Sequence, residues 1–270
     1  MTGESDFVAS LARRFGVAPP GETWIGDDAA VLRPPDGPLL LCIDPMVQGV
    51  HFTDVTADVG WTAVARNVSD IAAMGGRPLH AVVSLVLPRG AEVEALLDGL
   101  TEAADALCPI VGGDTSSGGT LVVTVAVTGT VDGGDPVLRS GARPGDAVFV
   151  TGPLGGRPRR PEPRVGEGIA ARGAGATAMV DVSDGLATDL RRLGIGMAID
   201  VVPVADGASW DDALFAGEDY ELVFTAPDVA RVLAAFDQHE PPIQIGVCTD
   251  DGELRLGDGP LPEGGWEHRW

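Results

Sequence analysis

The chain has 270 residues, of which 44% are hydrophobic, so it can bury a sizeable core, and wholesale disorder is excluded. Acidic residues outnumber basic ones by 40 to 18, and the net charge of −22 argues against nucleic acid or a membrane surface as a partner. Every basic residue is arginine, which excludes a lysine-dependent Walker A loop. Bound phosphates would therefore rely on metal ions, backbone N–H groups and arginine.

The start of the chain and the cysteines add two expectations. Residues 1–7 are polar and acidic, unlike a signal peptide, and the longest apolar runs are too short to cross a bilayer, so we expect a cytoplasmic protein. Cys42, Cys108 and Cys248 are widely spaced, which favours buried thiols over disulfides or a zinc site.

The first 140 residues alternate between helical and strand patterns. Apolar residues at helical spacing predict a helix over 5–15, and a turn signal at 34–37 predicts a hairpin of strands 29–32 and 39–43. Asp58 is a candidate N-cap for a helix that reaches Met74. A strand over 79–87, a helix over 91–107 and a strand over 121–131 follow.

The turn at 141–146 marks a boundary, so we expect one domain over 1–140 and a second over 141–270. Residues 155–175 are rich in Gly, Pro and Arg and predict a loop with one short helix near 168–172. The rest predicts strands at 147–150, 179–182, 198–202, 220–225 and 243–247, and helices at 186–193 and 227–236. The expected fold class is α/β.

Aspartates recur at the expected ends of elements. They occur in five segments and are Asp27, Asp28, Asp44, Asp70, Asp114, Asp181 and Asp184. Each one alone is explained by helix capping or turn formation. If the five segments converge, the carboxylates would repel one another unless divalent cations neutralised them. A set of oxygen ligands without a Cys/His cluster favours several Mg²⁺ ions, which normally bridge to phosphates.

These acids belong to longer motifs that follow one another along almost the whole chain. They are GDDAAVL (26–32), DPMVQGVHF (44–52), ARNVSDIAAMGGRP (65–78), VGGDTSSG (111–118), LRSGARPGD (138–146), DVSDGLATDL (181–190), GEDYELVFT (217–225) and GWEH (265–268). The set resembles the thiamine-monophosphate kinase family. That family belongs to the superfamily that also holds aminoimidazole ribonucleotide synthetase, selenophosphate synthetase and a hydrogenase-maturation protein.

The resemblance implies a two-domain fold like that of aminoimidazole ribonucleotide synthetase: a mixed-sheet N-terminal domain and a smaller α/β C-terminal domain. It implies a homodimer formed through the first domain's sheet, with ATP as co-substrate and thiamine monophosphate as acceptor. The aspartates named above resemble the family's Mg²⁺ ligands. The ATP contacts would be Gly113, Asp114, Arg139 and Ser183, and the acceptor contacts His51, Glu218 and Trp266. No catalytic base is expected, because the attacking phosphate is already anionic.

The chain departs from the family pattern at two places. Cys42 and Ile43 stand where the family usually has Ser or Thr before the aspartate of the second strand. Residues 156–178 are shorter than the family's segment, so we expect a reduced outer layer in the second domain. Two alternatives stay open: a weakened or non-catalytic homologue, and another ATP-dependent member of the superfamily. Without the resemblance, His51 and Trp266 would be packing residues, and Glu218, Asp219 and Glu221 a solvated face.

Overall fold

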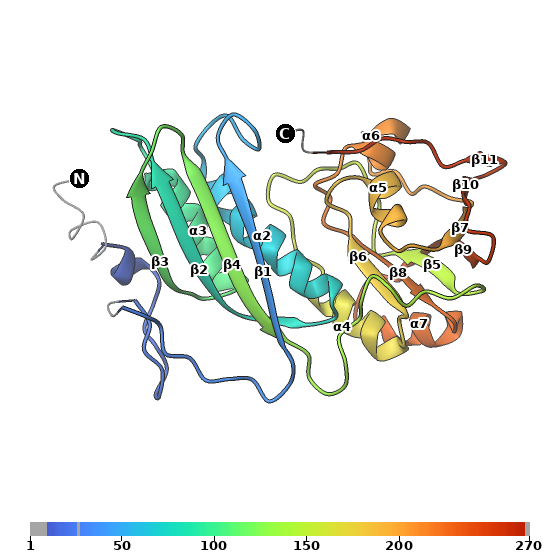
Figure 1. Ribbon diagram of the computed structural model, residues 1–270, viewed down its shortest axis with the longest axis horizontal. Coiled ribbons are helices and arrows are strands. Elements are labelled where there is room, and N and C mark those ends of the chain that lie inside the picture. The colour runs from blue at the N-terminus through green and yellow to red at the C-terminus, as the bar shows by residue number, and fades with distance from the viewer. Residues whose placement is uncertain (1–9, 26–27, 268–270) are drawn as a thin grey trace. The chain divides into compact units, whose positions relative to one another are not determined.

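The computed structural model describes residues 10–25 and 28–267. The chain divides into two compact units, each with its own sheet (Figure 1). Unit 1 comprises residues 1–71 and 78–132, and unit 2 comprises residues 72–77 and 133–270. Within the described part of the chain, no helix is long and apolar enough to cross a membrane.

Unit 1 is a four-stranded sheet with helices on one face (Figure 1). The strands are β1 (Leu39–Val47), β2 (Arg77–Leu87), β3 (Ile110–Ser117) and β4 (Val122–Thr130), in the order β1-β4-β2-β3. The helices are α2 (Ala57–Ala73) and α3 (Glu94–Ala106). β1 runs antiparallel to β4, and β2 runs parallel to β3. The mixture of the two pairings confirms the expected mixed sheet.

The two faces of this sheet differ in cover. On β4, Val123, Val125 and Val127 are fully buried because they alternate toward the helices, as the pleat requires. On β1, every second side chain points to the sheet face that the helices do not cover. Three of them, Leu39, Leu41 and Ile43, are 61%, 70% and 65% exposed. None of the described residues buries this apolar outer face of β1.

Unit 2 holds a seven-stranded sheet with helices on both faces. Its strands are β5 (Ala147–Val150), β6 (Ala178–Asp181), β7 (Gly196–Ile199), β8 (Leu222–Ala226), β9 (Ile243–Thr249), β10 (Leu254–Leu256) and β11 (Gly259–Pro260), in the order β11-β10-β7-β9-β5-β8-β6. Its helices are α4 (Val165–Ala174), α5 (Leu186–Arg191), α6 (Trp210–Phe215) and α7 (Val229–Ala235).

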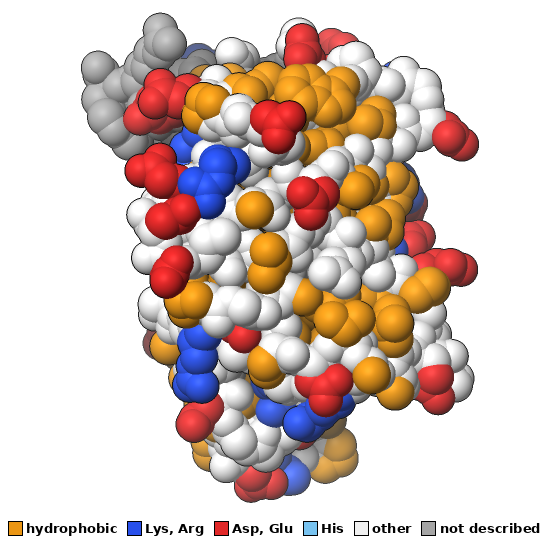
Figure 2. All heavy atoms as spheres, turned by 90° about the vertical axis from the view of Figure 1, so that its right-hand side faces the viewer, with side chains coloured by type: hydrophobic (Ala, Val, Ile, Leu, Met, Phe, Trp, Pro, Cys, Tyr) orange, Lys and Arg blue, Asp and Glu red, His pale blue; other side chains and the backbone are white. Residues whose placement is uncertain are grey.

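Alternation along β5 shows how the sheet of unit 2 is covered. Val148 and Val150 pack with residues of α5 and α6, whereas Ala147 and Phe149 pack with residues of α4 and α7. Phe149 also stacks on Phe224 of β8, at 5.1 Å between ring centroids. On the face of the molecule in Figure 2, acidic side chains are widely scattered, as the net charge of −22 requires.

Most predicted elements are present within a few residues of their expected bounds. The short helix expected near 168–172 is α4, which is longer than expected. The hairpin of 29–32 with 39–43 is wrong: Val31 pairs with Thr23, and β1 pairs with the distant β4. Asp58 lies in the first turn of α2 rather than before it. β3 was not predicted, because its Gly-Gly-Asp core has little strand propensity, and neither were α6, β10 and β11.

Candidate functional site

Asp44 and Asp70 lie close together in unit 1, on the side of the sheet that α2 covers. Asp44 lies within β1, opposite Val125, and not at the end of the strand as expected. Its Oδ2 is 3.5 Å from Nε of Arg66 on α2. The neighbouring Cys42 donates from Sγ to the backbone O of Asn67 (3.2 Å). Burial, followed by the charges of Asp70 and Asp44, raises the pKa of the Cys42 thiol far above its usual value.

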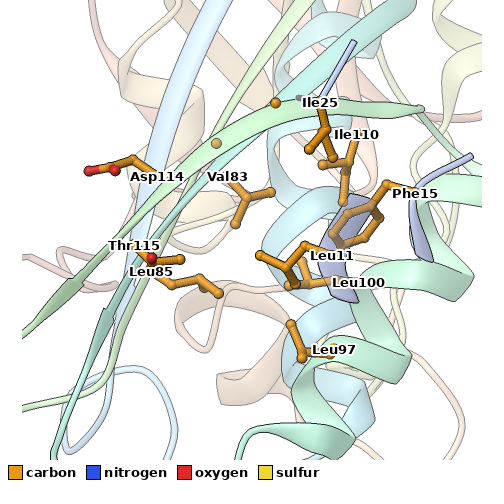
Figure 3. A pocket seen from close by; sticks show the side chains of 12 residues that line it. Leu11, Phe15, Ile25, Val83, Leu85, Leu97, Leu100, Ile110, Asp114 and Thr115 are labelled. Atoms are coloured by element: carbon orange, nitrogen blue, oxygen red, sulfur yellow. The ribbon is translucent and has the colours of Figure 1, made fainter. Parts of the chain in front are cut away.

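Asp114 is exposed and lies on the opposite side of the same sheet. It is paired with Ser84 in the β2–β3 register. Figure 3 shows Asp114 pointing away from a pocket that Val83, Leu85 and Ile110 line on the helix side. β1 and β3 are the two outer strands of the four, so three strand spacings, about 14 Å, separate them. Within one chain, unit 1 therefore does not bring Asp114 to Asp44 and Asp70.

The other candidates in the first 140 residues are spread over loops and strands. Asp28 lies in a bend, and Asp27 lies outside the described residues. Gly113 on β3 leaves no room for a side chain, because an added Cβ would lie 2.1 Å from the backbone O of Val83. His51 closes the turn after β1: its Nδ1 accepts a hydrogen bond from the backbone N–H of Val47 (3.0 Å). Arg139 is exposed in a loop of unit 2.

Asp181 is the buried last residue of β6, and the loop between β6 and α5 holds two further candidates, Ser183 and Asp184. Its backbone is fixed by Asp189 of α5, which is fully buried and which the sequence analysis did not select. Oδ2 of Asp189 accepts hydrogen bonds from the backbone N–H groups of Ser183 and Asp184, both at 3.1 Å. Arg192 forms ion pairs with both Asp184 and Asp189. Burial raises the pKa of the Asp189 carboxyl to about 7, against the opposing effect of Arg192.

Two segments distant in sequence dock on this loop. The backbone N–H of Glu218 donates to the backbone O of Ser183 (2.9 Å), and the backbone N–H of Trp266 donates to the backbone O of Asp184 (2.9 Å). Gly217 makes the first contact possible: its φ is +67°, and an added Cβ would lie 2.4 Å from the backbone O of Ser183. Unit 2 thus brings together four predicted site residues: Ser183, Asp184, Glu218 and Trp266.

The acidic run after Gly217 is not a solvated face, which corrects the simpler interpretation of the sequence. Asp219 and Glu221 are only 7% and 5% exposed. Glu221 accepts a hydrogen bond from the Thr151 hydroxyl (2.5 Å) and two from the Arg164 guanidinium (2.5 and 3.0 Å). No alternation marks this burial in the sequence, because Tyr220 and all of β8 are buried as well.

Within each unit taken alone, no three His, Cys, Asp or Glu side chains among the described residues gather closely enough to hold a metal ion. The candidate ligands are all carboxylates, and Asp44 and Asp184 each have an arginine as their nearest cation. Cations are therefore already paired with two of these acids. The donor chemistry fits Mg²⁺, which prefers carboxylate oxygen.

The two sheets, one mixed and the other covered by helices on both faces, define a two-part α/β protein. Residues 26–131 match the family model "AIR synthase related protein, N-terminal domain". The chain is 36% identical to the thiamine-monophosphate kinase of Rhodopirellula baltica over 287 aligned positions, which cover 90% of this chain and 88% of the relative. The chain therefore belongs to the thiamine-monophosphate kinase family.

Solved structures agree with this assignment. The crystal structure of thiamine-monophosphate kinase from Stenotrophomonas maltophilia K279a is 32% identical, with a TM-score of 0.81, covering 95% of this chain and 96% of that one. A structure described as AaThiL complexed with AMPPCP and TMP is 28% identical, with a TM-score of 0.78, covering 99% of this chain and 97% of that one. The expected two-part α/β fold is confirmed.

Proposed function

We propose that the protein transfers the γ-phosphate of ATP to thiamine monophosphate, giving thiamine diphosphate and ADP. Family membership over almost the whole chain supports the reaction, and a relative solved with AMPPCP and TMP supports both substrates. The observation that carries the proposal in this chain is the contact of three segments in unit 2. Ser183 and Asp184, assigned to ATP and metal, are hydrogen-bonded through their carbonyls to Glu218 and Trp266, assigned to the acceptor.

The residue roles follow from the chemistry of the two substrates. The acceptor carries a cationic thiazolium ring, for which the Glu218 carboxylate is a counter-charge and the half-exposed Trp266 indole a stacking and cation–π surface. His51 is assigned to the same substrate. Arg139 offers a guanidinium fork to ATP phosphates, and Gly113, which lies next to Asp114 on β3, is assigned to the same substrate.

Magnesium is part of the proposal. Asp27, Asp28, Asp44, Asp70, Asp114, Asp181 and Asp184 would hold several Mg²⁺ ions, and these would neutralise the charge that builds up between two phosphates. The carboxylates of the chain would orient the triphosphate through these ions, since the chain has no lysine to do so. No side chain needs to remove a proton, because the attacking oxygen of the acceptor phosphate is already anionic. In-line transfer then depends on positioning.

We further propose that residues 1–140 bind metal and ATP and form a homodimer, while residues 141–270 complete the nucleotide and acceptor site, in the cytoplasm. The apolar outer face of β1 supports the dimer, since Leu41 and Ile43 are 70% and 65% exposed. Asp114 lies on the same outer side of the sheet, so a second copy docked there would meet it. The variant Leu41→Glu should shift the protein from dimer to monomer in sedimentation analysis, whereas Val17→Glu, at another exposed apolar side chain, should not.

A coupled assay of ADP release with thiamine monophosphate, ATP and Mg²⁺ tests the function. Turnover that requires all three components supports the kinase. Tight binding of thiamine diphosphate or nucleotide without turnover would favour a non-catalytic binder instead. Turnover with another phosphorylated or carboxylated acceptor would place the chain in a different branch of the superfamily.

A further inference from the structure

An unusual backbone conformation is concentrated next to the proposed acceptor site. Among the described residues other than glycine, only Arg157, Glu218 and Tyr220 have positive φ angles, at 43°, 58° and 55°. Side chains disfavour this region, so it persists only where surrounding contacts hold it in place. The three residues belong to two segments, 155–157 and 217–220, which contact each other.

The buried carboxylate of Asp219 joins these two segments. Its Oδ2 accepts a hydrogen bond from the backbone N–H of Gly155 (2.8 Å), and its Oδ1 accepts one from the backbone N–H of Arg157 (3.0 Å). Asp219 lies directly between Glu218 and Tyr220, two of the three residues with positive φ angles. Fixing its side chain therefore fixes the backbone on both sides of it.

A second contact joins the same segments at the surface. Nη2 of Arg157 is 3.4 Å from Oε2 of Glu218, and both side chains are about half exposed. Farther along, the buried Glu221 is held by Arg164, so both ends of the strap 157–164 are tied to the motif that carries Glu218. Of the three acids Glu218, Asp219 and Glu221, only Glu218 is exposed to solvent, and it is the one assigned to the acceptor.

We propose that Asp219 is a positioning residue for the acceptor: by holding residues 155–157 against Glu218, it sets the direction of the Glu218 carboxylate and places Arg157 beside it. The inference rests on the proposed function. It adds Arg157 as a specificity residue at the edge of the site. A thiazolium-bearing phosphate monoester carries both a cation and an anion, and an adjacent Glu218 and Arg157 match that pair of charges.

The test is steady-state kinetics of Asp219→Asn with each substrate varied in turn. The amide keeps the size of the carboxyl group but turns an NH₂ toward one of the two backbone N–H donors. Charged hydrogen bonds are strong enough that we expect the KM for thiamine monophosphate to rise about tenfold or more, with the KM for ATP unchanged. A merely structural role would lower kcat or the folded fraction and move both KM values together.

The matched control is Asp251→Asn. Asp251 also accepts a backbone N–H, that of Glu253 (3.1 Å), and pairs with an arginine, but it lies in the turn before β10. Its variant should keep both KM values. An Asp219→Asn protein that folds and keeps the wild-type KM for the acceptor would overturn the proposal.

Arg157→Ala provides a second test that does not depend on folding of the first variant, because its side chain is exposed. We expect a rise of roughly twofold to fivefold in the acceptor KM alone. An unchanged acceptor KM in this variant overturns the proposal even if Asp219→Asn does not fold. The two proposals fail differently: a wild-type protein without transfer to thiamine monophosphate refutes the function, whereas active wild type with unaltered variants refutes only the positioning role.

Discussion

The two units place their predicted site residues in opposite ways. In unit 1 three of the candidate acids lie inside regular elements: Asp44 on β1 and Asp70 on α2 share one side of the sheet, while Asp114 on β3 faces the other side. In unit 2 the candidates lie on loops that are bonded to one another, with Ser183 and Asp184 at the centre. Regular elements fix each acid separately, whereas the loops of unit 2 arrange several groups relative to one another.

This difference suggests a division of labour. A site formed inside one unit can be fully arranged before any ligand arrives, and the loops of unit 2, held by Asp189 and Asp219, meet that condition. The acids of unit 1 need something else, an ion or a second copy of the chain, to bring them into a common site. Four experiments challenge or refine this contrast.

The largest effect is expected from Asp114→Asn. If Asp114 holds a metal that screens the transferring phosphate, turnover should fall about 100-fold or more. Because the side chain is exposed, the free energy of unfolding should change by less than about 0.5 kcal/mol. Asp184→Asn should lower turnover similarly. Wild-type turnover in Asp114→Asn, measured by ADP release, would remove Asp114 from the proposed metal ligands.

Gly217→Ala should disrupt the docking of loops in unit 2. The added methyl group would lie 2.4 Å from the backbone O of Ser183, at a residue with φ of +67°, so we expect a loss of roughly 2–3 kcal/mol in unfolding free energy. The control is Gly207→Ala, where φ is +80° but nothing lies within 4 Å of the new carbon. Equal losses of unfolding free energy in the two variants, measured by urea denaturation, would mean that the close contact between Gly217 and Ser183 contributes nothing to stability.

Thiol alkylation should report the opening of each unit separately. Burial raises the pKa of Cys108 in unit 1 to about 12 and that of Cys248 in unit 2 to about 11. Only thiolate reacts, so at pH 8 the folded protein should alkylate Cys248 about 100-fold more slowly than the unfolded chain, and Cys108 more slowly still. Mass spectrometry across a urea series would show which cysteine is released first. Rapid labelling of either thiol without urea would contradict the burial.

The smallest effect concerns the turn at Asp251 in unit 2. Hydrogen bonds from Arg255, Thr249 and the Glu253 N–H lower the pKa of this carboxyl to about 2. A lowered folded-state pKa means that the stabilisation is present above about pH 4 and is lost as the pH falls through about 2. The difference in urea midpoint between the wild type and Asp251→Asn should therefore shrink with acid. A constant difference would show that the charge of Asp251 is irrelevant.

Much of the fold was predictable because its elements carry clear periodicity. β4, with alternating valines, and α5, with Leu186 and Leu190 on one side, match their expected places. The failures have physical causes. Val31 was assigned to a local hairpin, but tertiary pairing gave β1 the distant partner β4. β3 was missed since Gly112 and Gly113 resemble a loop, although at Gly113 the Val83 backbone approaches so closely that only glycine fits.

The site was predictable in its residue types but not in its supporting contacts. Motif resemblance selected Asp184, Glu218 and Trp266, and the structure brings all three together in unit 2. It did not reveal which acids are buried and hold the backbone. Asp189 and Asp219 are acidic residues like their exposed neighbours, and only their burial and their backbone hydrogen-bond partners distinguish them. Such roles depend on chain segments far apart in sequence, which a single sequence does not place.

The bond between the backbone of Trp266 and the Asp184 carbonyl has a practical consequence. The indole is half exposed, and the backbone of Trp266 is bonded to that of Asp184, whose carboxylate pairs with Arg192. A cation that replaces Arg192 would alter the electric field at this fluorophore. Intrinsic emission, compared between the wild type and Trp266→Phe, would then follow ion and nucleotide binding without any attached dye.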